Sequence, residues 1–125
     1  ELEVYSANNL VIFIGDIFKL RESFLGTIDA IYDRAALVAL PETMRAHYTR
    51  HLLDITQHSP QLLICFEYDQ TQLEGPPFSV PASEVEQHYG NHYDLRLLSS
   101  EKVEGGLKGK CVAAENVWLL TLKGR

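Results

Sequence analysis

Residues 28–41 read IDAIYDRAALVALP and set the frame around which the remaining elements are placed. The apolar residues among 28–31 are typical of a buried strand, and the charged pair Asp33-Arg34 follows at its carboxyl end. Pro41 has the fixed φ that suits the first position of a helix. Because ligands bind at the carboxyl ends of the strands in an open α/β sheet, we expect a binding site beside this charged pair.

Strand and helix patterns alternate along the rest of the chain. In order we expect a hairpin, the strand already described, a helix, a strand, a helix and two strands, over residues 2–14, 28–31, 41–56, 62–66, 81–89, 93–98 and 117–122. Asn8-Asn9 tolerates the positive φ of a tight hairpin turn. The last two strands are joined by a loop alone, which favours antiparallel pairing. The pattern predicts an α/β sheet that is mostly parallel and ends in an antiparallel pair.

The predicted helix over residues 41–56 is amphipathic. Its apolar residues recur at spacings of four, four and three, which places on one face Met44, Tyr48, Leu52 and Ile55. Arg45 and Arg50 lie off that face, so we expect both side chains in solvent. His47 and His51 are one helical turn apart, a spacing that suits a metal ion, but no third ligand is evident and we expect no metal here.

Composition narrows the classes of function. The 125 residues form one domain at most and carry a formal net charge of -6, with no basic run for nucleic-acid phosphates. No apolar stretch approaches the roughly 20 residues that cross a bilayer, and the first residues lack the pattern of a signal peptide. The two cysteines, Cys65 and Cys111, give no disulfide framework, so we expect a reducing cytoplasm.

Two separate segments carry a family resemblance. IYDRAALVALP at residues 31–41 and GPPFSVP at 75–81, supported by GDIF at 15–18 and CFEYD at 65–69, resemble the thiopurine S-methyltransferase family. The resemblance implies the carboxyl-terminal part of a Rossmann-like class I methyltransferase. Such an enzyme transfers a methyl group from S-adenosylmethionine to the sulfur of an aromatic or heterocyclic thiol. Bacterial-looking members are also associated with selenium and tellurium compounds, so the natural acceptor stays open.

The chain departs from the family pattern in two places. Residues 1–125 contain no Gly-rich turn between a strand and a helix, the feature that holds the cofactor in this family. We therefore expect a single partial domain over residues 1–125, without the amino-terminal cofactor-binding part and inactive alone. Segment 104–114 has no arginine to reach the substrate, and Lys108 or Lys110 are the candidates to replace it.

The resemblance assigns cofactor contacts to Asp16, Ile17 and Arg34. Asp16 and Ile17 match positions that border the cofactor adenine; the other interpretation is a helix cap followed by a core isoleucine. Arg34 matches an arginine between cofactor and substrate, where its permanent positive charge would hold a thiolate. The other interpretation of Arg34 is an ion pair with Asp33 or Glu67 that fixes the strand end.

The resemblance assigns substrate contacts to Arg34 and to Pro76, Pro77 and Phe78, which would form a rigid wall beside a flat ring. The other interpretation of this wall is a tight structural turn. No catalytic residue and no metal ligand is assigned. Asp33 is interpreted as a structural partner, because aromatic thiols ionise without a strong base.

Two other functions stay open on these observations. One is a non-catalytic truncated domain that self-associates: strands missing from the middle of the sheet would bare an apolar edge that invites pairing with another chain. This hypothesis predicts that the chain forms a concentration-dependent oligomer and does not bind the cofactor. The other is a related methyltransferase acting on oxygen or nitrogen, which the two motifs disfavour. The enzyme interpretation gives the chain a small-molecule thiol as partner, with no nucleic acid and no membrane.

Overall fold

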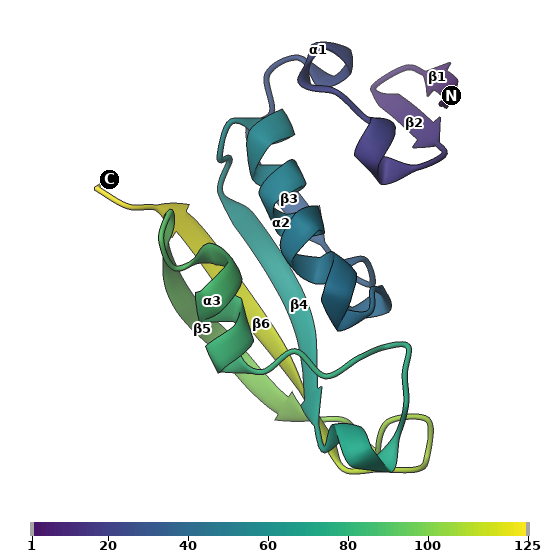
Figure 1. Cartoon of the computed structure of the whole chain (residues 1–125), viewed down its shortest axis with the longest axis vertical. Coiled ribbons are helices and arrows are strands. Elements are labelled where there is room, and N and C mark those ends of the chain that lie inside the picture. Colours follow the sequence, from purple (N-terminus) through teal and green to yellow (C-terminus); the bar gives the residue numbers. More distant parts are fainter. Residues whose placement is uncertain (1, 125) are drawn as a thin grey trace.

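The computed structural model describes residues 2–124. The elements follow in the order β1 (Glu3–Ala7), β2 (Leu10–Ile14), η1 (Ile17–Lys19), α1 (Glu22–Leu25), β3 (Ile31–Asp33), η2 (Leu37–Ala39), α2 (Glu42–Thr56), β4 (Gln61–Tyr68), η3 (Gln70–Gln72), α3 (Ala82–Tyr89), β5 (Tyr93–Lys102) and β6 (Ala113–Leu122), where η is a 3-10 helix. Figure 1 labels the strands and the α-helices. Each strand and helix that the sequence pattern predicted is present. Within residues 2–124, no helix has the length and apolar character needed to cross a membrane.

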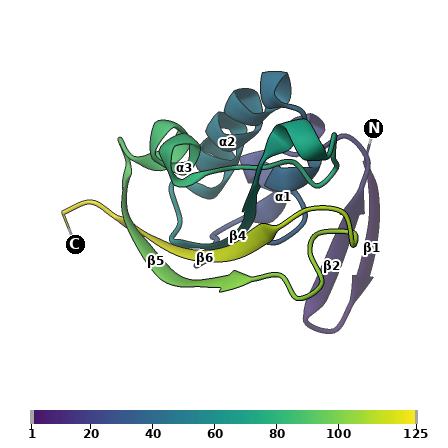
Figure 2. The ribbon, with the colours of Figure 1, turned by 90° about the horizontal axis from the view of Figure 1, so that it is seen from below.

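The four-stranded sheet is mixed and has the order β3-β4-β6-β5. β3 and β4 are parallel, whereas β6 runs antiparallel to both β4 and β5. Three strands therefore point in one direction, and β6 is inserted between two of them with the opposite direction. The predicted antiparallel pairing of the last two strands is confirmed. The prediction of a mostly parallel sheet is wrong: only the β3–β4 pairing is parallel, because β6 lies between β4 and β5 and pairs antiparallel with both. Figure 2 shows α2 and α3 together on one face of this sheet, so the fold has two layers.

β3 begins at Ile31, so the prediction that this strand starts at Ile28 is wrong. Its three residues pair with the first three residues of β4. The Ile31 N–H donates to the carbonyl of Pro60 (2.9 Å), but Pro60 has no N–H with which to extend the ladder. The strand nevertheless ends at Asp33, and this places the charged pair at its carboxyl end as the sequence indicates.

The main core lies between the helices and the sheet. Its buried residues are Leu37, Val38, Tyr48, Leu52, Leu53, Leu63, Cys65, Val80, Val85, Tyr89, Tyr93, Trp118 and Leu120. Met44, which was predicted on the apolar face of α2, is 38% exposed and is not part of this core. Arg50 is exposed, as predicted. The prediction that Arg45 lies in solvent is wrong: the residue is 4% exposed, because Glu84 of α3 pairs with it.

β1 and β2 form a separate antiparallel hairpin whose turn contains Asn9 at a φ of 65°. The apolar side chains of the hairpin that are 47% to 57% exposed are Val4, Tyr5, Leu10, Val11, Ile12 and Ile14. β3 is one of the two edge strands of the four-stranded sheet, and Tyr32 in it is 64% exposed. An apolar edge that pairs with another chain stays a prediction.

Candidate functional site

A cavity of about 320 Å³ lies near the carboxyl ends of β3 and β4. It is lined by Arg34, Ala35, Val38, Ala39, Ile64, Phe66, Pro76, Pro77 and Glu115. The sequence-predicted residues Arg34, Pro76 and Pro77 thus share one cavity, at the edge of the sheet where α/β folds bind ligands. A larger cavity of about 710 Å³ lies at the amino ends of the same strands and contains none of the sequence-predicted residues.

The proline wall of the cavity is held by hydrogen bonds along its length. The Tyr68 hydroxyl donates to the carbonyl of Pro77 (2.6 Å), and the Lys108 ammonium donates to the carbonyl of Pro76 (2.7 Å). The Phe78 N–H donates to the carbonyl of Val38 on the facing wall (2.7 Å). Since proline already restricts φ, these bonds leave the wall little freedom to move.

Phe78 does not line the cavity itself. Its ring packs across Gly75, where a methyl group would lie 2.7 Å from the ring atom Cδ1, and the guanidinium carbon of Arg45 lies 5.8 Å from the ring centroid. Phe78 therefore supports the adjoining prolines. The aromatic ring that lines the cavity belongs to Phe66. Sequence reasoning did not select Phe66, although its place at the end of a buried strand was a usable signal.

Arg34 is exposed and lines the cavity without forming an ion pair to any of the residues 2–124. Asp33 is 3% exposed and accepts hydrogen bonds from the Leu37 N–H (3.2 Å) and the Tyr48 hydroxyl (2.8 Å). Glu67 accepts instead from Asn116 (3.2 Å). Arg34 therefore lines the cavity without an ion-pair partner among the described residues, and Glu115 is the other charged residue of the lining.

Asp33 has a structural role, as interpreted from the sequence. It ties the end of β3 to the start of η2 through Leu37 and to α2 through Tyr48. Burial raises the pKa of the Asp33 carboxyl, and the hydrogen bonds from Tyr48, Leu37 and Ala36 oppose that rise without cancelling it. Burial, together with the nearby Asp33 charge, also raises the pKa of Tyr48.

The raised pKa of Asp33 predicts how stability responds to acid. The folded chain binds the proton of the Asp33 carboxyl more tightly than the unfolded chain does, so protonation of Asp33 stabilises the fold. This contribution to the free energy of unfolding is fully present below the ordinary pKa of 3.8 and is lost as the pH rises through the pKa of the folded chain. We expect the wild type to gain stability relative to Asp33→Asn when the pH falls from 7 to 3.5. Urea unfolding of both proteins at the two pH values checks this, and a pH-independent difference would contradict it.

Asp16 and Ile17 lie outside the cavity. The Asp16 carboxylate caps η1 by accepting from the Phe18 N–H (3.0 Å), and Ile17 packs at the border of the main core. The Ile17 carbonyl accepts from His51 Nε2 (2.9 Å). Within the chain, Asp16 therefore acts as a helix cap and Ile17 as a packing residue, as the other interpretation of these two residues states. Their contact with a cofactor stays a prediction.

His47 and His51 of α2 pack against Phe18 of η1. The His47 ring stacks on Phe18 with centroids 4.1 Å apart, and the His51 ring is tilted against Phe18 at 5.5 Å. In the part of the chain that the structure describes, no three His, Cys, Asp or Glu side chains gather as a metal site. The i, i+4 histidine spacing here serves to pack the hairpin connection against α2.

The family model described as thiopurine S-methyltransferase matches residues 1–123. This chain belongs to the thiopurine S-methyltransferase family. It is 53% identical over 119 residues to a thiopurine S-methyltransferase of Teredinibacter turnerae, and 56% identical over 116 residues to one of Xanthobacter autotrophicus. A relative from Gluconobacter oxydans is 52% identical over 117 residues. The family resemblance carried by the two sequence motifs is confirmed.

The matches cover nearly all of this chain and only part of each family relative. They include 95%, 93% and 94% of this chain, against 56%, 54% and 53% of the three proteins. The chain therefore spans about half the length of the curated thiopurine S-methyltransferases it matches.

Proposed function

We propose that this chain forms the acceptor side of an S-adenosylmethionine-dependent methyltransferase acting on the sulfur of an aromatic or heterocyclic thiol. The observation that carries the proposal is the cavity that joins Arg34 to the apolar surfaces of Phe66, Pro76 and Pro77. A flat ring fits between apolar walls, and a guanidinium keeps its positive charge at any physiological pH. The family name of the relatives supports the same acceptor class.

The proposed roles of the residues follow from where each lies. Arg34 attracts and orients the thiolate, while the proline wall and Phe66 fix the plane of the ring and exclude water from it. Asp33 is not a base in this scheme, because its buried carboxylate already accepts hydrogen bonds from Leu37 and Tyr48 and the thiol ionises without help. S-adenosylmethionine supplies the methyl group when bound.

The described residues fit part of S-adenosylmethionine. Asp16 is exposed and uses Oδ1 for its helix cap, so its other carboxylate oxygen remains available for a polar adenine edge. Ile17 is half-buried and offers apolar surface beside it. We propose that these two residues and Arg34 hold the cofactor, and that residues 1–125, which contain no Gly-rich strand-to-helix turn, bind it weakly alone.

A binding titration of this chain tests the proposal. Isothermal titration calorimetry with purine-6-thiol, at a pH where the thiol is ionised, should give saturable binding to the wild type. We expect Arg34→Gln to weaken that binding by about 10- to 100-fold, the effect of losing one hydrogen bond to a charged group.

Arg50→Gln is the matched control, because Arg50 is also an exposed arginine and lies on α2 outside the cavity. It should bind the thiol as the wild type does. Absence of binding by the wild type, or equal binding by wild type and Arg34→Gln, would overturn the proposed acceptor site.

The second candidate function is a non-catalytic domain that self-associates. It is favoured by the exposed β3 edge and the apolar hairpin, on which Val4, Leu10 and Val11 are each more than half exposed. The self-associating domain requires an oligomer and no thiol binding. Sedimentation of the chain over a range of concentrations, together with the thiol titration, therefore distinguishes the two candidate functions.

A further inference from the structure

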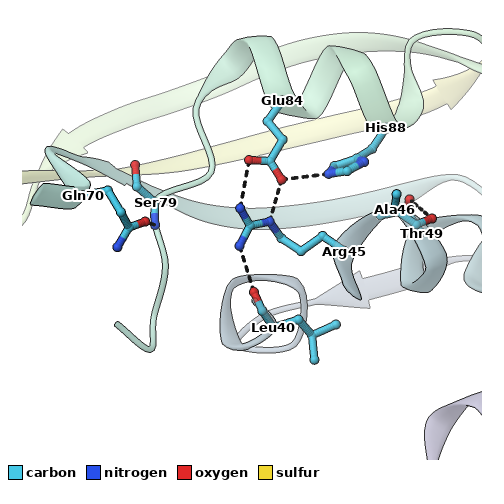
Figure 3. Close-up of polar contacts among 8 residues, drawn as sticks. All are labelled: Leu40, Arg45, Ala46, Thr49, Gln70, Ser79, Glu84 and His88. Atoms are coloured by element: carbon cyan, nitrogen blue, oxygen red, sulfur yellow. Dashed lines mark hydrogen bonds and ion pairs between the residues drawn. The ribbon is translucent and has the colours of Figure 1, made fainter. Parts of the chain in front are cut away.

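A buried ion-pair network joins α2 to α3 beside the cavity. Arg45 Nε donates to Glu84 Oε2 (2.5 Å), and Arg45 Nη2 donates to Glu84 Oε1 (3.2 Å). His88 Nε2 lies 2.8 Å from Glu84 Oε2. Figure 3 shows the three side chains meeting between the two helices. The side chains of Arg45 and Glu84 are only 5% and 15% exposed, so the pair is shielded from water.

Arg45 also contacts the residue that directly follows each wall of the cavity in the sequence. Its Nη1 donates to the carbonyl of Leu40 (2.8 Å), directly after η2, and Figure 3 shows this bond on the side away from Glu84. Behind the proline wall, the guanidinium carbon is 5.8 Å from the Phe78 ring centroid, within the range of a cation–π interaction. One buried group therefore contacts the segment before α2 and the segment before α3.

The two walls also contact each other through a hydrogen bond. The Phe78 N–H donates to the carbonyl of Val38, a residue that lines the cavity (2.7 Å). In the described chain no strand pairing connects η2 with residues 75–78. This hydrogen bond and the contacts of Arg45 link the two walls directly. Other contacts, from Tyr68 and through the Phe66–Ser79 bridge, attach the proline wall to β4.

We propose that Arg45 and Glu84 are positioning residues that set the width of the acceptor cavity and so hold an aromatic thiol beside Arg34. The inference rests on the proposed function of that cavity. Glu84 acts through Arg45, because a buried guanidinium stays in place only with a charged and hydrogen-bonded partner. Without the carboxylate the guanidinium moves toward water, and its contacts with Leu40 and Phe78 are lost.

The test combines amide hydrogen exchange, followed by nuclear magnetic resonance, with the thiol titration. In Glu84→Gln, which keeps the shape of the side chain, we expect exchange of the Phe78 amide to accelerate at least tenfold. Binding of purine-6-thiol should weaken about tenfold. Amides of β5 and β6, which report opening of the sheet, should keep their wild-type rates. A merely structural role of Glu84 would accelerate exchange at all of these amides together.

Two further variants control the test. Glu86→Gln makes the same chemical change at an exposed position of α3 and should leave exchange and binding unchanged. The double variant Arg45→Met with Glu84→Met removes both buried charges, so it should fold without an unpaired ion while still losing the Leu40 contact. We expect it to show the fast Phe78 exchange of Glu84→Gln.

The outcomes separate this inference from the function on which it rests. Wild-type Phe78 exchange in a folded Glu84→Gln, or in the double variant, would overturn the positioning role. A uniform acceleration over β5 and β6 would overturn it too. If the wild type does not bind purine-6-thiol, the acceptor site is wrong, and the exchange data still decide whether Arg45 and Glu84 fix the two walls.

Discussion

Replacing Glu84 with alanine should lower the free energy of unfolding by about 3 to 5 kcal/mol, the usual cost of breaking a buried ion pair by removing one partner. The cost arises because Arg45 is 4% exposed and has its Nε and one terminal nitrogen bonded to this carboxylate. Burial tends to raise the pKa of Glu84, but the hydrogen bonds and charges of Arg45 and His88 outweigh it and lower the pKa. The carboxylate is therefore ionised at neutral pH. Urea or guanidinium unfolding at pH 7 measures the loss.

The control for this prediction is Glu86→Ala, on an exposed part of the same helix, which should change the unfolding free energy by less than about 0.5 kcal/mol. The double methionine variant should be more stable than Glu84→Ala, since it leaves no buried guanidinium without its carboxylate partner. A loss below about 1 kcal/mol in Glu84→Ala would show that water reaches Arg45 and that the pair behaves as an exposed one.

Arg45 shows why the periodicity of the sequence predicted helix α2 but not the burial of every residue on it. The spacing of Tyr48 and Leu52 correctly predicts the buried face, because that signal is contained within the helix. Arg45 lies off the face and was expected in solvent. Its partner Glu84 is 39 residues away, on a helix whose position depends on the whole sheet, so no local pattern could indicate the burial.

Local signals also account for what the sequence predicted correctly elsewhere. The Asn8-Asn9 turn and the Asp16 cap depend on neighbouring residues only, and both are present. The order of the four strands depends on pairings between distant segments. Sequence patterns predicted that β5 and β6 pair, but not that β6 lies between β4 and β5.

In the candidate site too, the residues within local motifs were predicted, and those that depend on strand pairing were not. Arg34, Pro76 and Pro77 were predicted because they belong to recognisable motifs, and the fold brings all three to one cavity. Phe66 and Glu115 line it as well, and neither was predicted. They face the cavity because β4 and β6 are neighbours with Phe66 opposite Glu115, a register that the sequence of either strand does not specify.

Replacing Gly75 with alanine should lower the free energy of unfolding by about 2 to 5 kcal/mol and weaken thiol binding at the proline wall. Gly75 has a φ of +93°, which costs a residue with a side chain about 1 to 2 kcal/mol. The new methyl group would also lie 2.7 Å from Phe78 Cδ1, an overpacking that costs roughly 1 to 3 kcal/mol. Urea unfolding and calorimetric titration with purine-6-thiol measure the two effects.

Gly105→Ala separates the two causes, because Gly105 has a φ of +78° but open space where its methyl group would lie. It should therefore lose only the backbone part, about 1 kcal/mol, and bind the thiol normally. The extra loss in Gly75→Ala then measures the contact with Phe78, whose ring must move away from the prolines to admit the methyl group. Equal losses in the two variants, with thiol binding unchanged in both, would mean that the Phe78 ring yields freely and does not support the wall.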